Sequence, residues 1–492
     1  MRRKIAAVIG VAVLGALAWE LPQLRRTLIF DITRLDAEPR EPAPLPGGSG
    51  PGLTRVARTR VVLIDGLTAA TAETLPAWSA VCKRGITMTV EVGFPTVSLP
   101  VEVSLWTGLT QQQTGVVSRS DRPIVPPLDR KGIPAQVAGS WAVAENHGWI
   151  VRSLGFAKVE PAADPQAPAK DADAKAWDAQ WEAHALAAVS SPAPLAFVHI
   201  LRVDTAGHAH GLGADYDRIA HEADTILGTL VAADPDARWF VLSDHGHLPR
   251  GGHGGEEHAI RHVQGCIAGP GIAVARGELV HVVDLARAIA DSTGATLDPA
   301  SRGRPMSAAL ASPLSPDQGV PRTPLGAGAL AIFVLVAGLG AAAWGVRRWW
   351  LAPWWFVLAC ASLIVVRGVP TLSTGMIYRP EGRDMYLTWL PALALAFAST
   401  WFGLARMSLA RVVIAQLAVP FAAAAAALTV SGAWPAVFGA EVAPVVPVFT
   451  AWISPLLLLA AHGAAAVALA IVVSVVRPGA RASSAPPASD RS

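Results

Sequence analysis

Two stretches, each starting as an apolar run and ending in acidic and imidazole side chains, decide the fold of this chain. The first reads Leu195-Ala-Phe-Val-His-Ile-Leu-Arg-Val-Asp204-Thr-Ala-Gly-His208, and the second reads Trp239-Phe-Val-Leu-Ser-Asp244-His245-Gly246. Eight of the thirteen histidines lie between residues 208 and 262. Carboxylate and neutral imidazole are ligands that Zn²⁺ and similar cations select, and a solvated surface does not need this pairing. The pattern therefore predicts a metal site.

A third run of this kind lies upstream and reads Arg60-Val-Val-Leu-Ile-Asp65-Gly66. A short β-branched run ending in a carboxylate is typical of a buried parallel strand. Further strands are expected at 86–92, 149–156, 194–203 and 239–243, and helices at 71–84, 171–189 and 214–233. This alternation predicts an α/β fold with a mainly parallel sheet sandwiched by helices. Because open α/β sheets bind ligands at the carboxyl edge, we expect Asp65, Asp204 and Asp244 to meet there.

Composition indicates a membrane protein with one large folded domain. Of the 492 residues, 52% are hydrophobic, which is high for a soluble chain of this length. The net charge of +3 gives no indication of a nucleic-acid partner. The three cysteines have no metal-ligand spacing. Cys82 and Cys266 leave two interpretations open, a disulfide or isolated buried thiols, and we favour the thiols.

Charge and hydropathy divide the chain into segments. Arg2-Arg3-Lys4 precedes an apolar run, so residues 1–22 are expected to form a signal anchor or a cleaved signal peptide. Residues 23–58 and 301–325 are predicted linkers, because both contain Pro-rich stretches. Between them, residues 59–300 form the predicted catalytic domain. Residues 476–492 form a predicted cytoplasmic tail.

Residues 326–475 are expected to cross a membrane five times. Apolar runs of near-spanning length occur at 326–346, 349–366, 386–405, 412–433 and 449–475. Nine of the seventeen tryptophans lie from Trp344 onward, many at the ends of these runs. Arginines in the predicted inner turns place the domain of residues 59–300 outside, so we expect a multi-pass inner-membrane protein with a periplasmic head. A buried helical domain is the alternative interpretation of the five runs.

Four motifs together resemble the alkaline phosphatase superfamily, and most closely its type I phosphodiesterase/nucleotide pyrophosphatase branch. They are Asp65-Gly66, Pro95-Thr-Val-Ser98-Leu-Pro100 with Ser104-Leu-Trp-Thr-Gly108, Asp204-Thr-Ala-Gly-His208, and Asp244-His245-Gly246. Each motif alone is weak, but all four stand in the family's order and each follows a predicted strand. The resemblance covers roughly residues 59–300.

The resemblance implies two divalent metal ions beside a hydroxyl nucleophile, with Zn²⁺ favoured and Mn²⁺ as the alternative. One ion would be held by Asp65, Asp244, His245 and the oxygen of Ser98. The other would be held by Asp204, His208 and His253, the last chosen over the nearby His247, His258 and His262. Ser98 matches the family's nucleophile position best, and Thr96 is its competitor.

The remaining histidines are interpreted as structural: His147, His184, His199, His221 and His281. For His210 and His247 a loop or supporting role is favoured over phosphate binding. Glu256 and Glu257 fit equally well as groups that orient His253 and as solvated loop charges.

Three functions are compatible with these motifs. The first is a membrane-bound phosphodiesterase or phosphatase that hydrolyses a phosphate ester through a phospho-Ser98 intermediate. The second is a transferase that moves a phosphoethanolamine-type group from a lipid donor, because the layout is similar to the GPI ethanolamine phosphate transferases. Its substrate would be lipid-linked, and membrane lipids would be partners. The third is an inert head on a membrane scaffold. Sulfatase chemistry is disfavoured, because the sulfatase pattern has Arg where this chain has Glu102.

Overall fold

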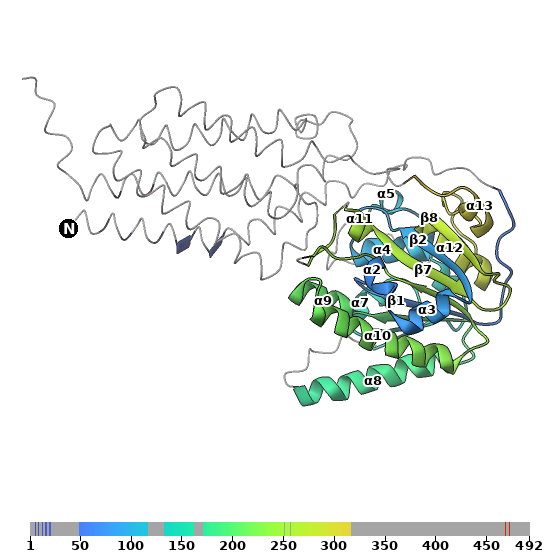
Figure 1. Ribbon diagram of the computed structural model, residues 1–492, viewed down its shortest axis with the longest axis horizontal. Coiled ribbons are helices and arrows are strands. Elements are labelled where there is room, and N and C mark those ends of the chain that lie inside the picture. The colour runs from blue at the N-terminus through green and yellow to red at the C-terminus, as the bar shows by residue number, and fades with distance from the viewer. Residues whose placement is uncertain are drawn as a thin grey trace, which may run out of the picture. The chain divides into compact units, whose positions relative to one another are not determined.

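The computed structural model describes residues 49–116, 132–161, 171–249, 251–255 and 257–315, with single positions near the two ends of the chain. Residues 49–315 of this description belong to one compact unit, whose centre is an eight-stranded sheet (Figure 1). The strand order is β4-β3-β5-β1-β6-β7-β2-β8. The strands are β1 (Thr59–Ile64), β2 (Gly85–Glu91), β3 (Trp141–Ala144), β4 (Lys158–Glu160), β5 (Leu195–Ile200), β6 (Arg238–Leu242), β7 (His262–Ala268) and β8 (Ala275–His281).

All pairings in this sheet are parallel except those of β7, which runs antiparallel to both β6 and β2. Strands β5, β1 and β6 are adjacent at the centre and buried along their whole length. Their carboxyl ends therefore meet at one edge of the sheet. The prediction of a mainly parallel sheet with flanking helices is confirmed.

Helices cover both faces of the sheet, so the strands contribute side chains to two separate hydrophobic cores. Alternate residues of β5 show this division, because Leu195 and Phe197 pack in one core while Val198 and Ile200 pack in the other. The first face is covered by α4 (Ser98–Thr107), α6 (Ile133–Gln136), α7 (Gly148–Arg152), α12 (Val282–Thr293) and α13 (Met306–Ala311). The second is covered by α2 (Ala69–Ala72), α3 (Pro76–Cys82), α8 (Asp171–Ser190), α9 (Arg202–His210) and α10 (Ala214–Ala233) (Figure 1). The short helices α5 (Gln111–Thr114) and α11 (His258–Arg261) complete the described elements.

The long, strongly patterned elements agree with the sequence prediction, and the shorter ones deviate from it. Helix α10 has the predicted bounds, and α8 exceeds its prediction by one residue. The helix predicted at 71–84 is wrong as a single element, because Pro76 starts a new helix and separates α3 from α2.

The strand predicted at 149–156 is also wrong, because that run begins with helix α7. Ile150, Val151 and Leu154 are apolar and buried, as strand residues would be, but they pack on the first face from a helix and the turn after it. A short apolar run does not distinguish the two by periodicity alone. The strand in this region is β3, whose sequence Trp-Ala-Val-Ala is poor in β-branched residues.

Cys82 at the end of α3 and Cys266 in β7 form a disulfide, so the preference for isolated thiols is corrected. The predicted linker 301–325 also contains structure, because α13 packs against α12 and β8. No helix in the described parts of the chain has both the length and the apolar character needed to cross a bilayer. Apart from single positions, the five apolar runs and the predicted anchor lie outside the described residues.

Candidate metal centre

The carboxyl edge of the three central strands positions the acidic side chains of the candidate site. Asp65 follows β1 directly, and Asp244 lies two residues beyond β6. Asp204 lies in the first turn of α9, which begins two residues after β5. The prediction that these three carboxylates meet at one edge agrees with this arrangement, although Asp204 comes from a helix and not from a strand end.

The first cluster consists of Asp65, Asp244 and His245, whose side chains are completely buried. His245 Nε2 lies 3.2 Å from Asp65 Oδ1 and 3.4 Å from Asp244 Oδ2. Ser98 Oγ lies 3.4 Å from both Asp65 Oδ1 and His245 Nε2. The structure thus brings together the four groups that the family resemblance assigns to one ion.

The second cluster consists of Asp204, His208 and His253. His208 Nε2 lies 3.0 Å from His253 Nε2, and the two nitrogens lie 3.3 and 3.5 Å from Asp204 Oδ1. These side chains are 9–16% exposed, so this cluster has access to solvent. The imidazole of His253 stacks on that of His245, with ring centroids 3.7 Å apart, and this contact joins the two clusters.

Backbone carbonyls fix which nitrogen each of these two stacked rings turns toward its cluster. His245 Nδ1 donates to the carbonyl of Gly246 at 3.1 Å, and His253 Nδ1 donates to the carbonyl of Thr96 at 2.9 Å. A carbonyl only accepts, so in the neutral ring the proton is on Nδ1 and the lone pair is on Nε2. Both Nε2 atoms face their clusters, where a bound cation would take the place of an Nε2 proton beside the carboxylate oxygens.

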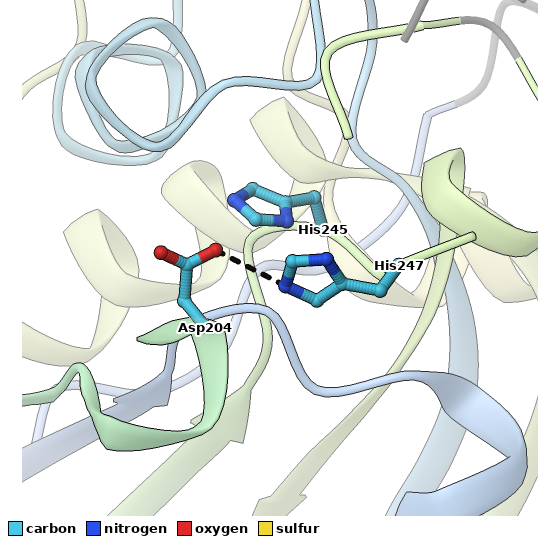
Figure 2. A group of neighbouring side chains, drawn as sticks. All are labelled: Asp204, His245 and His247. Carbon is cyan, nitrogen blue, oxygen red and sulfur yellow. Dashed lines mark hydrogen bonds and ion pairs between the residues drawn. The ribbon is translucent and has the colours of Figure 1, made fainter. Parts of the chain in front are cut away.

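His247 has the opposite tautomer and therefore a different role. Its Nδ1 accepts the Gly252 amide at 3.0 Å, which leaves the proton of the neutral ring on Nε2. Nε2 donates to Asp204 Oδ1 at 3.1 Å (Figure 2). Asp204, His245 and His247 also form a geometrically possible ligand group, but a protonated Nε2 is not a donor to a cation. His247 orients Asp204 instead, in agreement with the supporting role favoured from the sequence.

Two glycines make room for this arrangement. A Cβ on Gly207 would lie 2.4 Å from His247 Nε2, so the ring packs directly against bare helix backbone. Gly66 has φ +72°, and a Cβ there would lie 2.8 Å from the Asp204 Cα. The glycines of the Asp65-Gly66 and Gly207-His208 dipeptides are thus explained by neighbouring side-chain and backbone atoms that leave no room for a Cβ.

Thr96 and Ser98 are distinguished by their hydrogen bonds. The Thr96 hydroxyl donates to the Gly255 carbonyl at 2.8 Å and accepts the Gly254 amide at 2.9 Å. It therefore anchors the glycine-rich loop that carries His253. The Ser98 hydroxyl faces the first cluster and begins α4. This geometry favours Ser98 over Thr96 as the reactive hydroxyl.

Sequence reasoning missed two buried side chains beside Asp65, His199 and Glu102. His199 Nε2 lies 3.2 Å from Asp65 Oδ2 and 3.5 Å from Glu102 Oε1, and both side chains have no exposed surface. Burial alone would lower the pKa of His199, but the charge of Glu102 and the bond to Asp65 raise it to about 9. Burial raises the pKa of Glu102 to about 7, against the opposing charge of His199.

The electrostatics of the first cluster fit a bound divalent cation. Burial and the neighbouring Asp65 raise the pKa of Asp244 well above its usual range. Burial likewise favours protonation of Asp65, but its bonds to His199 and His245 outweigh that effect and hold its pKa low. Asp244 Oδ2 is buried and has no hydrogen-bond partner among the described residues. A buried carboxylate oxygen that has no hydrogen bond among the described residues and lies 3.4 Å from His245 Nε2 fits a divalent cation.

In the second cluster, burial lowers the pKa of both imidazoles. For His208 the neighbouring histidines add to this effect, and for His253 the charge of His245 does so. Neutral imidazole is the form that binds a metal ion. Among the other candidates, His262 donates from Nε2 to Glu91 at 3.0 Å, and the ring of His258 packs against it. Neither belongs to a ligand group found in the described residues, and Glu256 lies outside them.

Comparisons with known proteins show which family this domain resembles. Residues 59–257 match the family described as type I phosphodiesterase / nucleotide pyrophosphatase, so the resemblance drawn from the four motifs is confirmed. No curated protein matches the chain. A solved structure of murine ectonucleotide pyrophosphatase / phosphodiesterase 5 aligns over 49% of this chain and 96% of its own, at 13% identity with a TM-score of 0.39. An alkaline phosphatase superfamily protein from Vibrio parahaemolyticus aligns over 59% and 79%, at 14% identity with a TM-score of 0.38.

Proposed function

Starting from a domain of the type I phosphodiesterase / nucleotide pyrophosphatase family, we propose that this protein is a membrane-bound, two-metal phosphoric ester hydrolase with Ser98 as nucleophile. The observation that carries the proposal is the place of the Ser98 hydroxyl. It lies between Asp65 and His245, at the start of a helix and beside two Asp/His clusters.

The residues divide into two ligand sets in this proposal. Asp65, Asp244 and His245 would hold one ion together with the Ser98 oxygen. Asp204, His208 and His253 would hold the other. Two divalent ions in such sites lower the pKa of a bound hydroxyl and neutralise charge on the attacking and leaving oxygens of a phosphoryl group. Zn²⁺ suits the imidazole-rich set, and Mn²⁺ is the alternative.

The chemistry at Ser98 follows from its surroundings. Ser98 Oγ forms a bond to phosphorus while the bond from phosphorus to the leaving alcohol oxygen breaks, and the proton lost from Ser98 is balanced by the one that the leaving oxygen gains. This produces a phosphoserine and a free alcohol. Water then attacks the phosphorus, the phosphate product leaves, and a proton from the water restores the Ser98 hydroxyl. The amides of the first turn of α4 stabilise negative charge on the serine oxygen and on the phosphoryl group. Asp65 and His245 fix the direction of Oγ.

Four features support a periplasmic location with membrane attachment. The Arg-rich start of the chain, the five apolar runs and their flanking arginines are those of a multi-pass protein of the inner membrane. The disulfide between Cys82 and Cys266 is typical of an oxidising compartment. The apolar runs also favour a second candidate function. It is the transfer of a phosphoethanolamine-type group from a lipid donor onto a lipid-linked acceptor.

The test compares bis-p-nitrophenyl phosphate, p-nitrophenyl phosphate and p-nitrophenyl sulfate as substrates of the purified full-length chain loaded with Zn²⁺ or Mn²⁺. We expect cleavage of a phosphate ester and none of the sulfate. Absence of phosphate ester cleavage with either ion contradicts the hydrolase proposal. A labelled phospholipid donor, supplied with and without an alcohol acceptor, then separates hydrolysis from transfer.

A further inference from the structure

The two carboxylate oxygens of Asp65 contact different groups, one in the candidate site and the other a buried histidine behind it. Oδ1 lies 3.4 Å from Ser98 Oγ and 3.2 Å from His245 Nε2, while Oδ2 lies 3.2 Å from His199 Nε2. A carboxylate on a single side chain can rotate about its terminal bond and exchange these oxygens. Something must therefore restrain Asp65 if Oδ1 is to remain toward Ser98, and His199 is the group in contact with the other oxygen.

His199 reaches Asp65 from strand β5, on the face of the sheet that α4 covers. It follows Phe197 by two residues, and Phe197 packs in the same core as α4. The Phe197 and His199 rings lie with their centroids 6.2 Å apart. Because the strand is buried and rigid, the imidazole has a fixed direction.

Glu102 approaches the same imidazole from the helix that carries Ser98. The four-residue spacing places Ser98 and Glu102 on one face of α4. Glu102 Oε1 lies 3.5 Å from His199 Nε2, and neither carboxylate oxygen has a hydrogen bond within the described part of the chain. A buried carboxylate without compensation is strongly destabilising, and the contact with His199 offsets part of that cost.

We propose that His199 and Glu102 are a positioning pair that holds Asp65 with Oδ1 toward Ser98 and the proposed ion. Glu102 restrains His199, and His199 restrains Asp65, so the pair connects the helix bearing the nucleophile to two central strands. The inference rests on the proposed function, because it treats Asp65 as a metal ligand. It adds two residues that touch neither substrate nor ion.

The test measures binding of Zn²⁺ alone to the metal-free, full-length protein and to variants, with stoichiometry and affinity determined by competition with a chelating dye. His199→Ala should lower the affinity for one of the two Zn²⁺ ions by roughly 10–100-fold, the range for loss of a group that orients a ligand. The other ion, on Asp204, His208 and His253, should bind as in the wild type. Glu102→Gln should weaken the same ion, because the uncharged amide restrains His199 less.

Two further variants separate positioning from a general loss of stability. His199→Gln keeps an N–H donor near Asp65 and should restore most of the lost affinity. Asp284→Asn removes a different fully buried carboxylate, which lies away from the site and forms an ion pair with Arg304 at 2.7 Å. It should lower the melting temperature and leave both Zn²⁺ affinities unchanged. In turnover assays, His199→Ala should lower kcat with little change in KM.

Zn²⁺ affinities of Glu102→Gln and His199→Ala within twofold of the wild type would overturn the proposal. If His199→Ala does not fold, Glu102→Gln with unchanged affinities is sufficient to overturn it. A wild-type protein that binds two ions but cleaves no phosphate ester would contradict the proposed function and leave this inference to be decided by the affinities. A wild-type protein that binds no ion would overturn both.

Discussion

The two ligand clusters at the sheet edge differ in charge and in access to solvent. The first has two carboxylates and one imidazole, all fully buried, beside Ser98. The second has one carboxylate and two imidazoles, which are 9–16% exposed. With neutral imidazoles, a divalent ion is neutralised by the first set but keeps one positive charge in the second. The asymmetry suits a site in which one set activates the serine and the other attracts an anionic ester.

The supports of the two clusters differ as well. Asp65 is restrained by the buried His199, whereas His253 of the second cluster lies in a loop. Thr96 ties that loop in place, and His247 holds Asp204. Substitutions should therefore separate the two clusters, and the following expectations are ordered from the largest effect to the smallest.

Ser98→Ala should produce the largest loss of turnover while both ions remain bound. Removal of a serine nucleophile lowers kcat by roughly 10⁴-fold or more. Metal content measured by elemental analysis should stay near two ions per chain, because Asp65, Asp244 and His245 are intact. Substantial residual activity would move the nucleophile to water or to Thr96.

Asp244→Asn should remove the ion of the first cluster. The amide places a neutral oxygen or an N–H donor where the buried Asp244 Oδ2 has no hydrogen bond within the described part of the chain. We expect Zn²⁺ affinity at one site to fall by about 100-fold or more, beyond the effect of an orienting group, with a parallel loss of rate. Unchanged zinc content would refute the assignment of Asp244 as a ligand.

Gly207→Ala should act on the second cluster. Alanine normally stabilises a helix interior by about 1 kcal/mol relative to glycine. Here its Cβ would lie 2.4 Å from His247 Nε2, so the ring must move and Asp204 loses its donor. We expect the Zn²⁺ affinity of the second cluster to fall by about tenfold.

The matched control is Gly228→Ala in α10, where the nearest atom to the new Cβ is the Ala77 Cβ at 3.3 Å. This variant should keep both affinities. Equal effects of the two substitutions would show that His247 does not orient Asp204.

Thr96→Val should have the smallest effect. It removes the two hydrogen bonds that anchor residues 254–255, and the folded state should lose about 1–3 kcal/mol in chemical denaturation. Zn²⁺ binding at His253 should weaken by a few-fold, with turnover retained. Complete loss of turnover in Thr96→Val, together with retained turnover in Ser98→Ala, would exchange the roles of the two hydroxyls.

The sequence was most informative where a buried strand ends in a charged residue. Strands β1, β5 and β6 are dense apolar runs, and Asp65, Asp204 and Asp244 follow them closely, so both the sheet edge and the convergence of the carboxylates were predictable. Strands β3, β4, β7 and β8 were not identified. They are short, poor in β-branched residues or interrupted by glycine, and sheet pairing rather than local propensity decides their conformation.

His199 shows why part of the site was missed. A single histidine in an apolar run is usually a core residue, and its partner Glu102 lies 97 positions earlier, on α4. A usable signal was nevertheless present. His199 lies two residues after Phe197 in β5, so both side chains point to the face of the sheet that α4 covers. Glu102 lies one helical turn after Ser98 on that helix. The Cys82–Cys266 pair has no comparable local signal, because only the packing of α3 against β7 brings the two residues together.

The most direct test is anomalous X-ray diffraction from crystals grown with Zn²⁺. Two peaks are expected, one about 2.0–2.2 Å from Asp65, Asp244 and His245, and the other at the same distance from Asp204, His208 and His253. Absence of an ion beside Ser98, or a single ion on Asp204, His245 and His247, would contradict the two-cluster assignment.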